Sequence, residues 1–356
     1  AAVAALLYVE MLEEGFTRVG EFHYLHHDRD GSAYADRAAM AKGIVEAAHD
    51  TGIGLTLLPV FYAHGGFNGE SPNAGQRRFV TGLDSYARLL AETRRATADL
   101  DGAVVGVAPH SLRAVTPEEL ATVVPLAGDG PVHIHIAEQA AEVEAWLDWS
   151  GMRPVAWLLA HQPVDGRWCL VHATHMTPEE TAAMARSAAV AGLCPITEAN
   201  LGDGTFNGPE FSAAGGRFGV GSDSNVLVSL PGELRQLEYA QRLLHRARNV
   251  MATPARPSTG RALFEGALSG GAVALGTPGA GLRPGAWADC VSLDAAHPAL
   301  AGREGDAALD SWIFASRDGL VEGVWSRGRK VVSAGRHHRR AAVRARFAAT
   351  MARLLA

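Results

Sequence analysis

Histidine and acidic side chains recur at the ends of short apolar runs in this chain, where they could bind a metal ion and move protons. The run from His133 to Glu138 places His133 and His135 on one face of a predicted strand and a carboxylate in the following loop. His172 and Asp223 follow two later runs of the same kind. Imidazole and carboxylate suit a hydrolytic zinc or iron ion, which lowers the pKa of bound water, and a carboxylate outside the ligand set can transfer protons. The pattern therefore predicts a metal-dependent hydrolase.

Three more polar side chains, Tyr24, His110 and Arg113, follow other predicted strands. Taken singly, each site residue has a structural interpretation: a histidine at a strand end is more often a hydrogen-bonded structural residue than a ligand, and Asp223 fits a helix N-cap. Tyr24 fits packing, and Arg113 fits the surface. The functional interpretation is favoured because these residues arrive at successive strand ends, where a parallel barrel builds its active site.

Seven short β-branched runs alternate with amphipathic segments, which predicts βαβ units and a parallel sheet. The predicted strands are 17–24, 52–61, 103–108, 132–137, 168–172, 189–194 and 217–222, and the predicted helices include 36–49, 116–124, 140–160, 177–187 and 231–246. Thr116 and Thr177 each precede a proline and an acid at the capping-box position, which indicates helix starts. An eight-stranded barrel needs one more strand before Ala1. The chain also begins without Met inside a predicted amphipathic helix, which suggests an incomplete front.

The predicted organisation is a barrel with a small satellite. Residues 1–275 would carry barrel strands 2 to 8, and a further helix is expected over 258–275. Residues 276–336 would form the C-terminal part of a small β domain, with a turn followed by a strand within 281–291 and a hairpin over 319–332. A C-terminal helix would close the chain within 337–356.

The composition of the chain argues against nucleic-acid and membrane partners and bears on the cell compartment. The chain has 356 residues and a net charge of -6, which argues against nucleic acid as a partner. No apolar run reaches the roughly 18 residues of a membrane span. Its three cysteines are an odd number, which argues against a disulfide framework and fits the reducing cytoplasm.

The motifs resemble those of the formimidoylglutamate deiminases, within the amidohydrolase superfamily. His135-x-x-Glu138, then His172, then Asp223 between two serines is the superfamily's deaminase order. The segments similar to this family in particular are 21–28, 133–139, 170–175 and 197–204, and the similarity extends to Arg336.

The resemblance implies a (β/α)8 TIM-like barrel of the metal-dependent amidohydrolase type, here with its first strand missing, plus part of a small β-sandwich domain. It implies one zinc ion per subunit, with iron as the alternative, and a homodimer. The reaction would convert N-formimidoyl-L-glutamate and water into N-formyl-L-glutamate and ammonia, a step of histidine breakdown. His135 and Asp223 would be zinc ligands, His172 would contact the water and the tetrahedral centre, and Glu138 would pass a proton to the departing ammonia. The two substrate carboxylates would be held by Tyr24, His110 and Arg113.

Two departures from the family pattern matter. No His-x-His pair precedes Tyr24, although the superfamily places one at the end of the first barrel strand. We therefore expect the polypeptide 1–356 by itself to bind zinc poorly and to be nearly inactive. Asn225 stands where the family pattern has histidine. Two alternatives stay open: another zinc aminohydrolase, acting on guanine, a cytosine-like ring or a chlorinated triazine, and a metal-free binding barrel.

Overall fold

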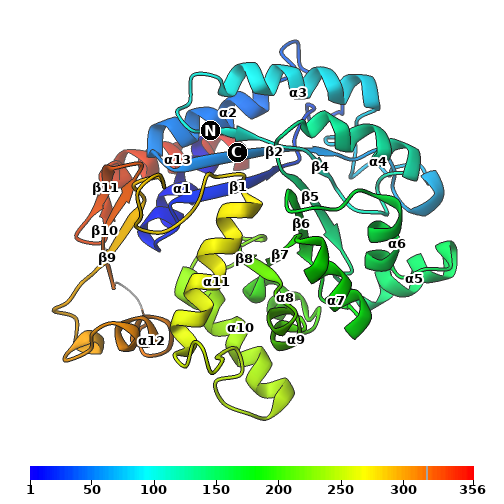
Figure 1. Cartoon of the computed structure of the whole chain (residues 1–356). Helices are drawn as coiled ribbons and strands as arrows, with labels where there is room; N and C mark the ends of the chain where they lie inside the picture. Colours follow the sequence, from blue (N-terminus) through cyan, green and yellow to red (C-terminus); the bar gives the residue numbers. More distant parts are fainter. Residues whose placement is uncertain (318–319) are drawn as a thin grey trace.

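A curved array of parallel strands forms the centre of the protein (Figure 1). The computed structural model describes residues 1–317 and 320–356. The strands of the array are β1 (Arg18–His23), β2 (Gly54–Phe61), β3 (Val104–Val105) with β4 (Ala108–Pro109), β5 (Val132–Ile136), β6 (Trp168–His172), β7 (Val190–Leu193) and β8 (Arg217–Val220). β1 to β4 form one parallel sheet and β5 to β8 another, and parallel bridges from Val107 to Val132 and from Ser111 to His135 join the two.

All seven predicted strands are confirmed. The third is divided into β3 and β4 around Gly106, whose hypothetical Cβ would lie 2.3 Å from the Pro131 carbonyl oxygen. That close approach of two backbones explains both the glycine and the interruption in the strand. All eight residues of β2 are buried, as expected for a strand covered on both faces.

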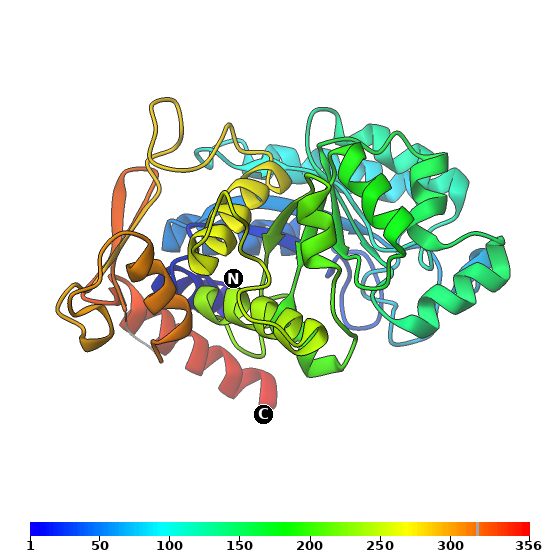
Figure 2. The same cartoon turned by 60° about the horizontal axis from the view of Figure 1, so that its bottom comes forward.

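Helices cover the outside of the strand array (Figures 1 and 2). They are α1 (Ala2–Glu13), α2 (Ala39–Thr51), α3 (Leu83–Thr97), α4 (Pro117–Val123), α5 (Ala140–Ser150), α6 (Pro154–His161), α7 (Pro178–Ser187), α8 (Pro195–Leu201), α9 (Gly208–Ala213), α10 (Leu230–His245) and α11 (Thr259–Ala274). Short 3-10 turns occupy Phe67–Gly69, Val124–Ala127 and Pro298–Leu300.

The predicted helix starts are confirmed, and one predicted helix is wrong in its extent. Thr116 and Thr177 both form complete capping boxes, with Glu119 and Glu180 respectively. The single helix expected over 140–160 is two helices instead. Gly151 ends α5 in the left-handed conformation, with φ 74°, and Pro154 begins α6. A left-handed glycine followed by a proline stops a helix and starts the next, whatever the apolar periodicity across them.

A four-stranded antiparallel sheet lies at one end of the molecule (Figure 2). Its strands are β9 (Cys290–Leu293), β10 (Val321–Ser326), β11 (Arg329–Ser333) and β12 (Arg336–His337), in the order β12-β11-β10-β9. β10 and β11 form the predicted hairpin, whose expected first residue, Gly319, lies outside the described residues. The helix α12 (Asp306–Phe314) packs on α10 and α11, and the C-terminal helix α13 (Arg340–Leu355) packs on α1. The domain boundaries 275/276 and 336/337 stay predictions.

Throughout the described ranges, no helix combines the length and apolarity that crossing a membrane would require.

Candidate active site

The strand ends bring the predicted site residues to one edge of the array. Tyr24 follows β1, His110 follows β4, Glu138 follows β5, His172 ends β6 and Asp223 follows β8. Since these strands are parallel, their carboxyl ends face the same way. Five residues without the freedom of glycine adopt left-handed backbone angles at these ends: Ala137 (φ 50°), His172 (φ 66°), Ala173 (φ 49°), Asp223 (φ 39°) and Asn225 (φ 55°). Such conformations cost energy and cluster at functional sites.

Three histidine rings lie next to one another across β4, β5 and β6. The His110 and His135 ring centroids are 5.0 Å apart, and those of His135 and His172 are 5.5 Å apart. The Nδ1 of His135 donates to the His110 carbonyl oxygen at 3.1 Å, and its Nε2 has no hydrogen-bond partner among the described residues. Burial, followed by the nearby His172, lowers the pKa of His135 to about 3. His135 is therefore neutral, as a metal ligand must be.

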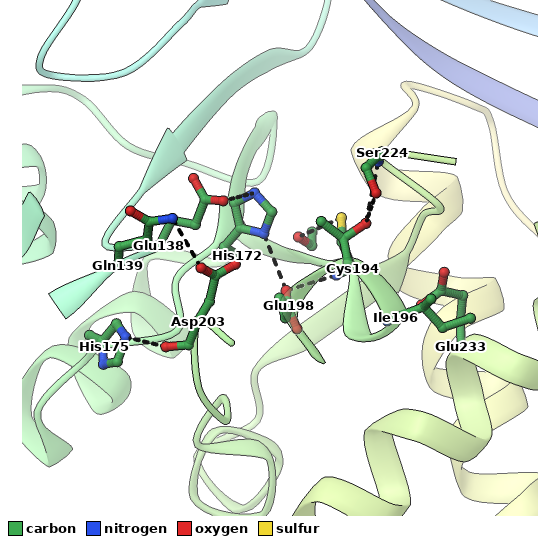
Figure 3. A network of polar contacts seen from close by, with 12 residues as sticks. Glu138, Gln139, His172, His175, Cys194, Ile196, Glu198, Asp203, Ser224 and Glu233 are labelled. Atoms are coloured by element: carbon green, nitrogen blue, oxygen red, sulfur yellow. Dashed lines mark hydrogen bonds and ion pairs between the residues drawn. The ribbon is translucent and has the colours of Figure 1, made fainter. Parts of the chain in front are cut away.

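His172 lies between two carboxylates, as Figure 3 shows. Its Nε2 is 3.7 Å from the Glu138 carboxylate, and its Nδ1 is 3.3 Å from the Glu198 carboxylate. Burial acts to lower the pKa of His172, but the hydrogen bond with Glu198 and the charges of Glu138, Glu198 and Asp223 outweigh it, so that the pKa is raised. The ring can thus hold a proton between two acceptors.

Glu138 and Asp223 both lie near other carboxylates, Asp203 among them. Desolvation raises the pKa of Glu138, and the charges of Asp203, Glu142 and Asp223 add to the rise while His172 opposes it. Desolvation also raises the pKa of Asp223, although the residue as a whole is exposed to solvent. The charge of His172 opposes the rise in pKa, and that of Asp203 adds to it. A carboxyl whose pKa is moved toward neutrality suits proton transfer near pH 7.

The three predicted substrate-binding residues are also brought together. The rings of Tyr24 and His110 have centroids 5.6 Å apart, and the Arg113 charge acts on the pKa of both. Arg113 is exposed, and across residues 1–317 and 320–356 its guanidinium has no hydrogen bond. It is therefore available to an anionic group. The ring of Tyr62, a residue that the sequence analysis did not single out, also packs against His110, with ring centroids 4.7 Å apart.

Two residues quoted in the motifs have structural roles. The Nε2 of His133 donates to the Ala274 carbonyl oxygen at 2.7 Å, at the end of α11. Asn225 accepts a hydrogen bond from the Ser222 hydroxyl at 2.7 Å, within the turn that carries Asp223. The same turn is attached to α8, because Thr197 contacts the Ser222 carbonyl oxygen at 3.3 Å and the Ser224 hydroxyl at 2.9 Å.

Sequence reasoning missed the contacts of Glu198, Asp203 and Gln139. Glu198 and Asp203 belong to a motif segment, but nothing in the sequence gives them a partner. In the structure, the Gln139 amide donates to the Asp203 carboxylate at 3.1 Å, and Asp203 is buried near the other acidic residues (Figure 3). Glu198, four residues after Cys194, accepts that residue's backbone N–H at 2.9 Å. The capping-box spacing is three residues, so this four-residue contact follows no recognised signal in the sequence.

Two donor sets could hold a metal ion. The predicted pair, His135 and Asp223, has the right chemistry, since the free Nε2 of His135 and a carboxylate both suit zinc. A second set consists of His172, Cys194 and Glu198, which have ligand atoms within 4.8 Å of one another. Burial raises the pKa of the Cys194 thiol well above its usual range, so a metal ion bound there would first have to displace the proton of a buried thiol. The predicted pair therefore fits a metal better.

The chain has relatives among characterised enzymes. A formimidoylglutamate deiminase of Pseudomonas aeruginosa is 54% identical over 336 residues, which cover 94% of this chain and 74% of that protein. A 5-methylthioadenosine/S-adenosylhomocysteine deaminase of Natronomonas pharaonis is 27% identical over 81% of this chain and 61% of its own length.

Solved structures share the architecture. An amidohydrolase from Brucella melitensis superposes with a TM-score of 0.97 at 59% identity, covering 100% of this chain and 78% of that one. An atrazine chlorohydrolase from Arthrobacter aurescens TC1, complexed with zinc, superposes with a TM-score of 0.81 at 22% identity, covering 98% and 76%, and shares the fold alone. The model of the amidohydrolase family matches residues 1–331. The chain belongs to the amidohydrolase family.

Proposed function

We propose that this protein hydrolyses N-formimidoyl-L-glutamate to N-formyl-L-glutamate and ammonia. The observation that carries the proposal is Glu138 set 3.7 Å from the Nε2 of His172, beside the neutral imidazole of His135. The 54% identity to a formimidoylglutamate deiminase supports this choice of substrate.

The chain's own residues account for the proton movements. Water adds to the amidine carbon, and the bond from that carbon to the terminal nitrogen breaks. Glu138 takes a proton from the water and passes it to the terminal nitrogen. The remaining hydroxyl proton of the tetrahedral centre then moves to the same nitrogen, which departs as ammonia while the carbon–oxygen double bond forms. His172 contacts the water and the oxygen of the tetrahedral centre through its Nε2. Arg113, Tyr24 and His110 bind the glutamate carboxylates, for which the unpaired guanidinium supplies charge-assisted hydrogen bonds.

The metal is part of the proposal. His135 and Asp223 would hold one zinc ion per subunit, with iron as the alternative metal, and the ion would supply Lewis acidity that lowers the pKa of water toward neutrality. We further propose a homodimer, which only the family resemblance implies, and a location in the cytoplasm, which the cysteine usage favours.

The test measures ammonia release from N-formimidoyl-L-glutamate by the protein expressed from its complete reading frame with added zinc. Glu138→Gln should lower kcat by about 10²- to 10⁴-fold while zinc content is kept. The matched control is Glu144→Gln, an exposed position on α5, which should leave kcat unchanged. A folded, zinc-loaded wild-type protein that releases no ammonia from this substrate would refute the proposal.

A ring-acting aminohydrolase is the second candidate. The aromatic rings of Phe22, Tyr24, Tyr62 and Phe79 adjoin one another and His110 at the strand ends, and a flat substrate would stack on such rings. Ammonia release from guanine or cytosine, with none from N-formimidoyl-L-glutamate, would favour this candidate.

A further inference from the structure

We infer that Glu198 is a positioning residue that holds the His172 imidazole with Nδ1–H directed at α8 and Nε2 directed at Glu138. For its effect on turnover the inference rests on the proposed function. Its structural part, the orientation and protonation of one ring, stands independently.

Glu198 is itself rigidly held. It is 5% exposed and lies in α8, whose first turn follows β7 directly. Its carboxylate oxygen accepts the backbone N–H of Cys194 at 2.9 Å, and its own backbone N–H donates to the Cys194 carbonyl oxygen at 2.9 Å. Side chain and backbone are thus both attached to the same residue. The oxygen that contacts His172 therefore has a fixed position at the carboxyl end of β7.

The His172 ring depends on this oxygen for its orientation. His172 is 1% exposed, so within the described part of the chain its ring nitrogens have only Glu198 at Nδ1 and Glu138 at Nε2 as polar partners. Glu138 is part of a loop, and its side chain is 25% exposed. The buried Glu198 therefore fixes the orientation of the ring more firmly than the partly exposed Glu138. Figure 3 shows the two carboxylates on opposite sides of the imidazole.

A carboxylate at Nδ1 has two consequences for the reaction. In the neutral ring it selects the tautomer that carries the proton on Nδ1, so that Nε2 presents its lone pair to the reacting atoms. It also fixes the direction of Nε2, because the ring cannot turn without breaking the 3.3 Å contact between Nδ1 and Glu198. The buried carboxylate of a catalytic triad holds its histidine in the correct tautomer and orientation in the same way.

The competing interpretation makes Glu198 a metal ligand together with His172 and Cys194. It would require a thiolate at a buried position, beside a carboxylate that already accepts the Cys194 N–H. The two interpretations differ in what Cys194 does. As a ligand its sulfur is needed for metal content, whereas in our inference only its backbone N–H is used.

The first measurement is spectroscopic and is independent of turnover. In ¹⁵N-histidine-labelled wild-type protein, with the His172 signals assigned through His172→Gln, Nδ1 should have the shift and one-bond coupling of a protonated nitrogen. In Glu198→Gln that signature should be lost or mixed between the two tautomers. An unprotonated Nδ1 in the wild-type protein would overturn the inference, even if the variant failed to fold.

The second measurement is kinetic. Glu198→Gln should lower kcat about 10- to 100-fold and change KM by less than about threefold, because uniform substrate binding is not affected. The exposed Glu210→Gln of α9 is the matched control and should behave as wild type. An unchanged kcat in Glu198→Gln would overturn the inference.

Metal content separates the two interpretations. Cys194→Ala and Glu198→Gln should both retain the zinc content of the wild-type protein, and a parallel loss of zinc in both would assign the three residues to a metal site instead. A wild-type protein that is inactive on N-formimidoyl-L-glutamate would refute the proposed function, while the ¹⁵N signature would still decide the role of Glu198.

Discussion

At the scale of single residues, a buried carboxyl group supports the helix that carries Glu198. Glu233 of α10 accepts the Ile196 backbone N–H of α8 at 2.9 Å through one oxygen, and its other oxygen has no partner in the described part of the chain. Burial raises the pKa of Glu233 to about 8; the Ile196 hydrogen bond opposes the rise, and the charges of Glu198 and Asp223 add to it. The group is therefore protonated in the folded protein near neutral pH.

This raised pKa predicts a pH dependence of stability. Between the ordinary carboxyl value and about 8, the folded state holds a proton that the unfolded state has lost. Stability therefore falls as pH rises through that window, by at most about 1.4 kcal/mol per pH unit. Glu233→Gln should remove this contribution, so that its free energy of unfolding relative to wild type improves from pH 5 to pH 8. Urea unfolding at several pH values measures the difference in free energy of unfolding between the variant and wild type, and the exposed Glu210→Gln is the control. A difference that does not change with pH would contradict the prediction.

At the scale of elements, α11 packs against β8 with backbone nearly touching backbone. A Cβ at Gly270 would lie 1.9 Å from the Phe218 carbonyl oxygen, whereas a Cβ at the next residue, Gly271, meets no atom within 4 Å. The last turn of α11 also accepts the His133 hydrogen bond through Ala274. The close packing of this helix therefore fixes the start of the strand that carries His135.

Two adjacent glycines of α11 should respond in opposite ways to alanine. Gly270→Ala forces two backbones apart and should destabilise the protein by about 3 kcal/mol or more. Gly271→Ala only gains helix propensity and should be neutral or stabilise by roughly 0.5–1 kcal/mol. Chemical denaturation of the two variants measures both effects, and equal destabilisation by both substitutions would mean that the packing is not the cause.

At the scale of the whole molecule, Arg18 links the amino ends of the first strands to the segment before β9. Its guanidinium donates to the Leu55 carbonyl oxygen at 2.9 Å and to the Gly102 carbonyl oxygen at 2.6 Å, and it lies 4.6 Å from the centroid of the Trp287 ring. Arg18 is only 9% exposed. One side chain thus connects parts of the chain that are far apart in sequence, on the side of the array away from the site.

Replacing this arginine should weaken the whole fold without changing the site. Arg18→Met leaves two carbonyl oxygens without donors and removes the cation–π contact, so it should cost about 2–4 kcal/mol. The control is Arg217→Met, because Arg217 begins β8 and makes one exposed hydrogen bond to the Ala188 carbonyl oxygen; it should cost about 0.5 kcal/mol or less. Urea unfolding measures both, and similar losses would argue against the linking role of Arg18.

Local information in the chain was sufficient for much of the fold and for the residue types of the site. The seven strands follow from β-branched runs, and the helix starts at Thr116 and Thr177 follow from capping boxes, because both signals act over a few neighbouring residues. Parallel strands then imply that His135, Glu138, His172 and Asp223 meet at one edge. The break between α5 and α6 was missed because apolar periodicity continues across Gly151 and Pro154.

Only the tertiary structure decided which side chains contact one another. Glu198 lies 26 residues after His172, and their contact depends on the register of β6 and β7 and on where α8 begins. His133 and His135 are alike in the sequence, yet one faces α11 and the other faces His172. Contacts of this kind depend on distances and directions between elements distant in sequence. Residue types and spacing specify each element, but the packing of all the elements together determines those distances.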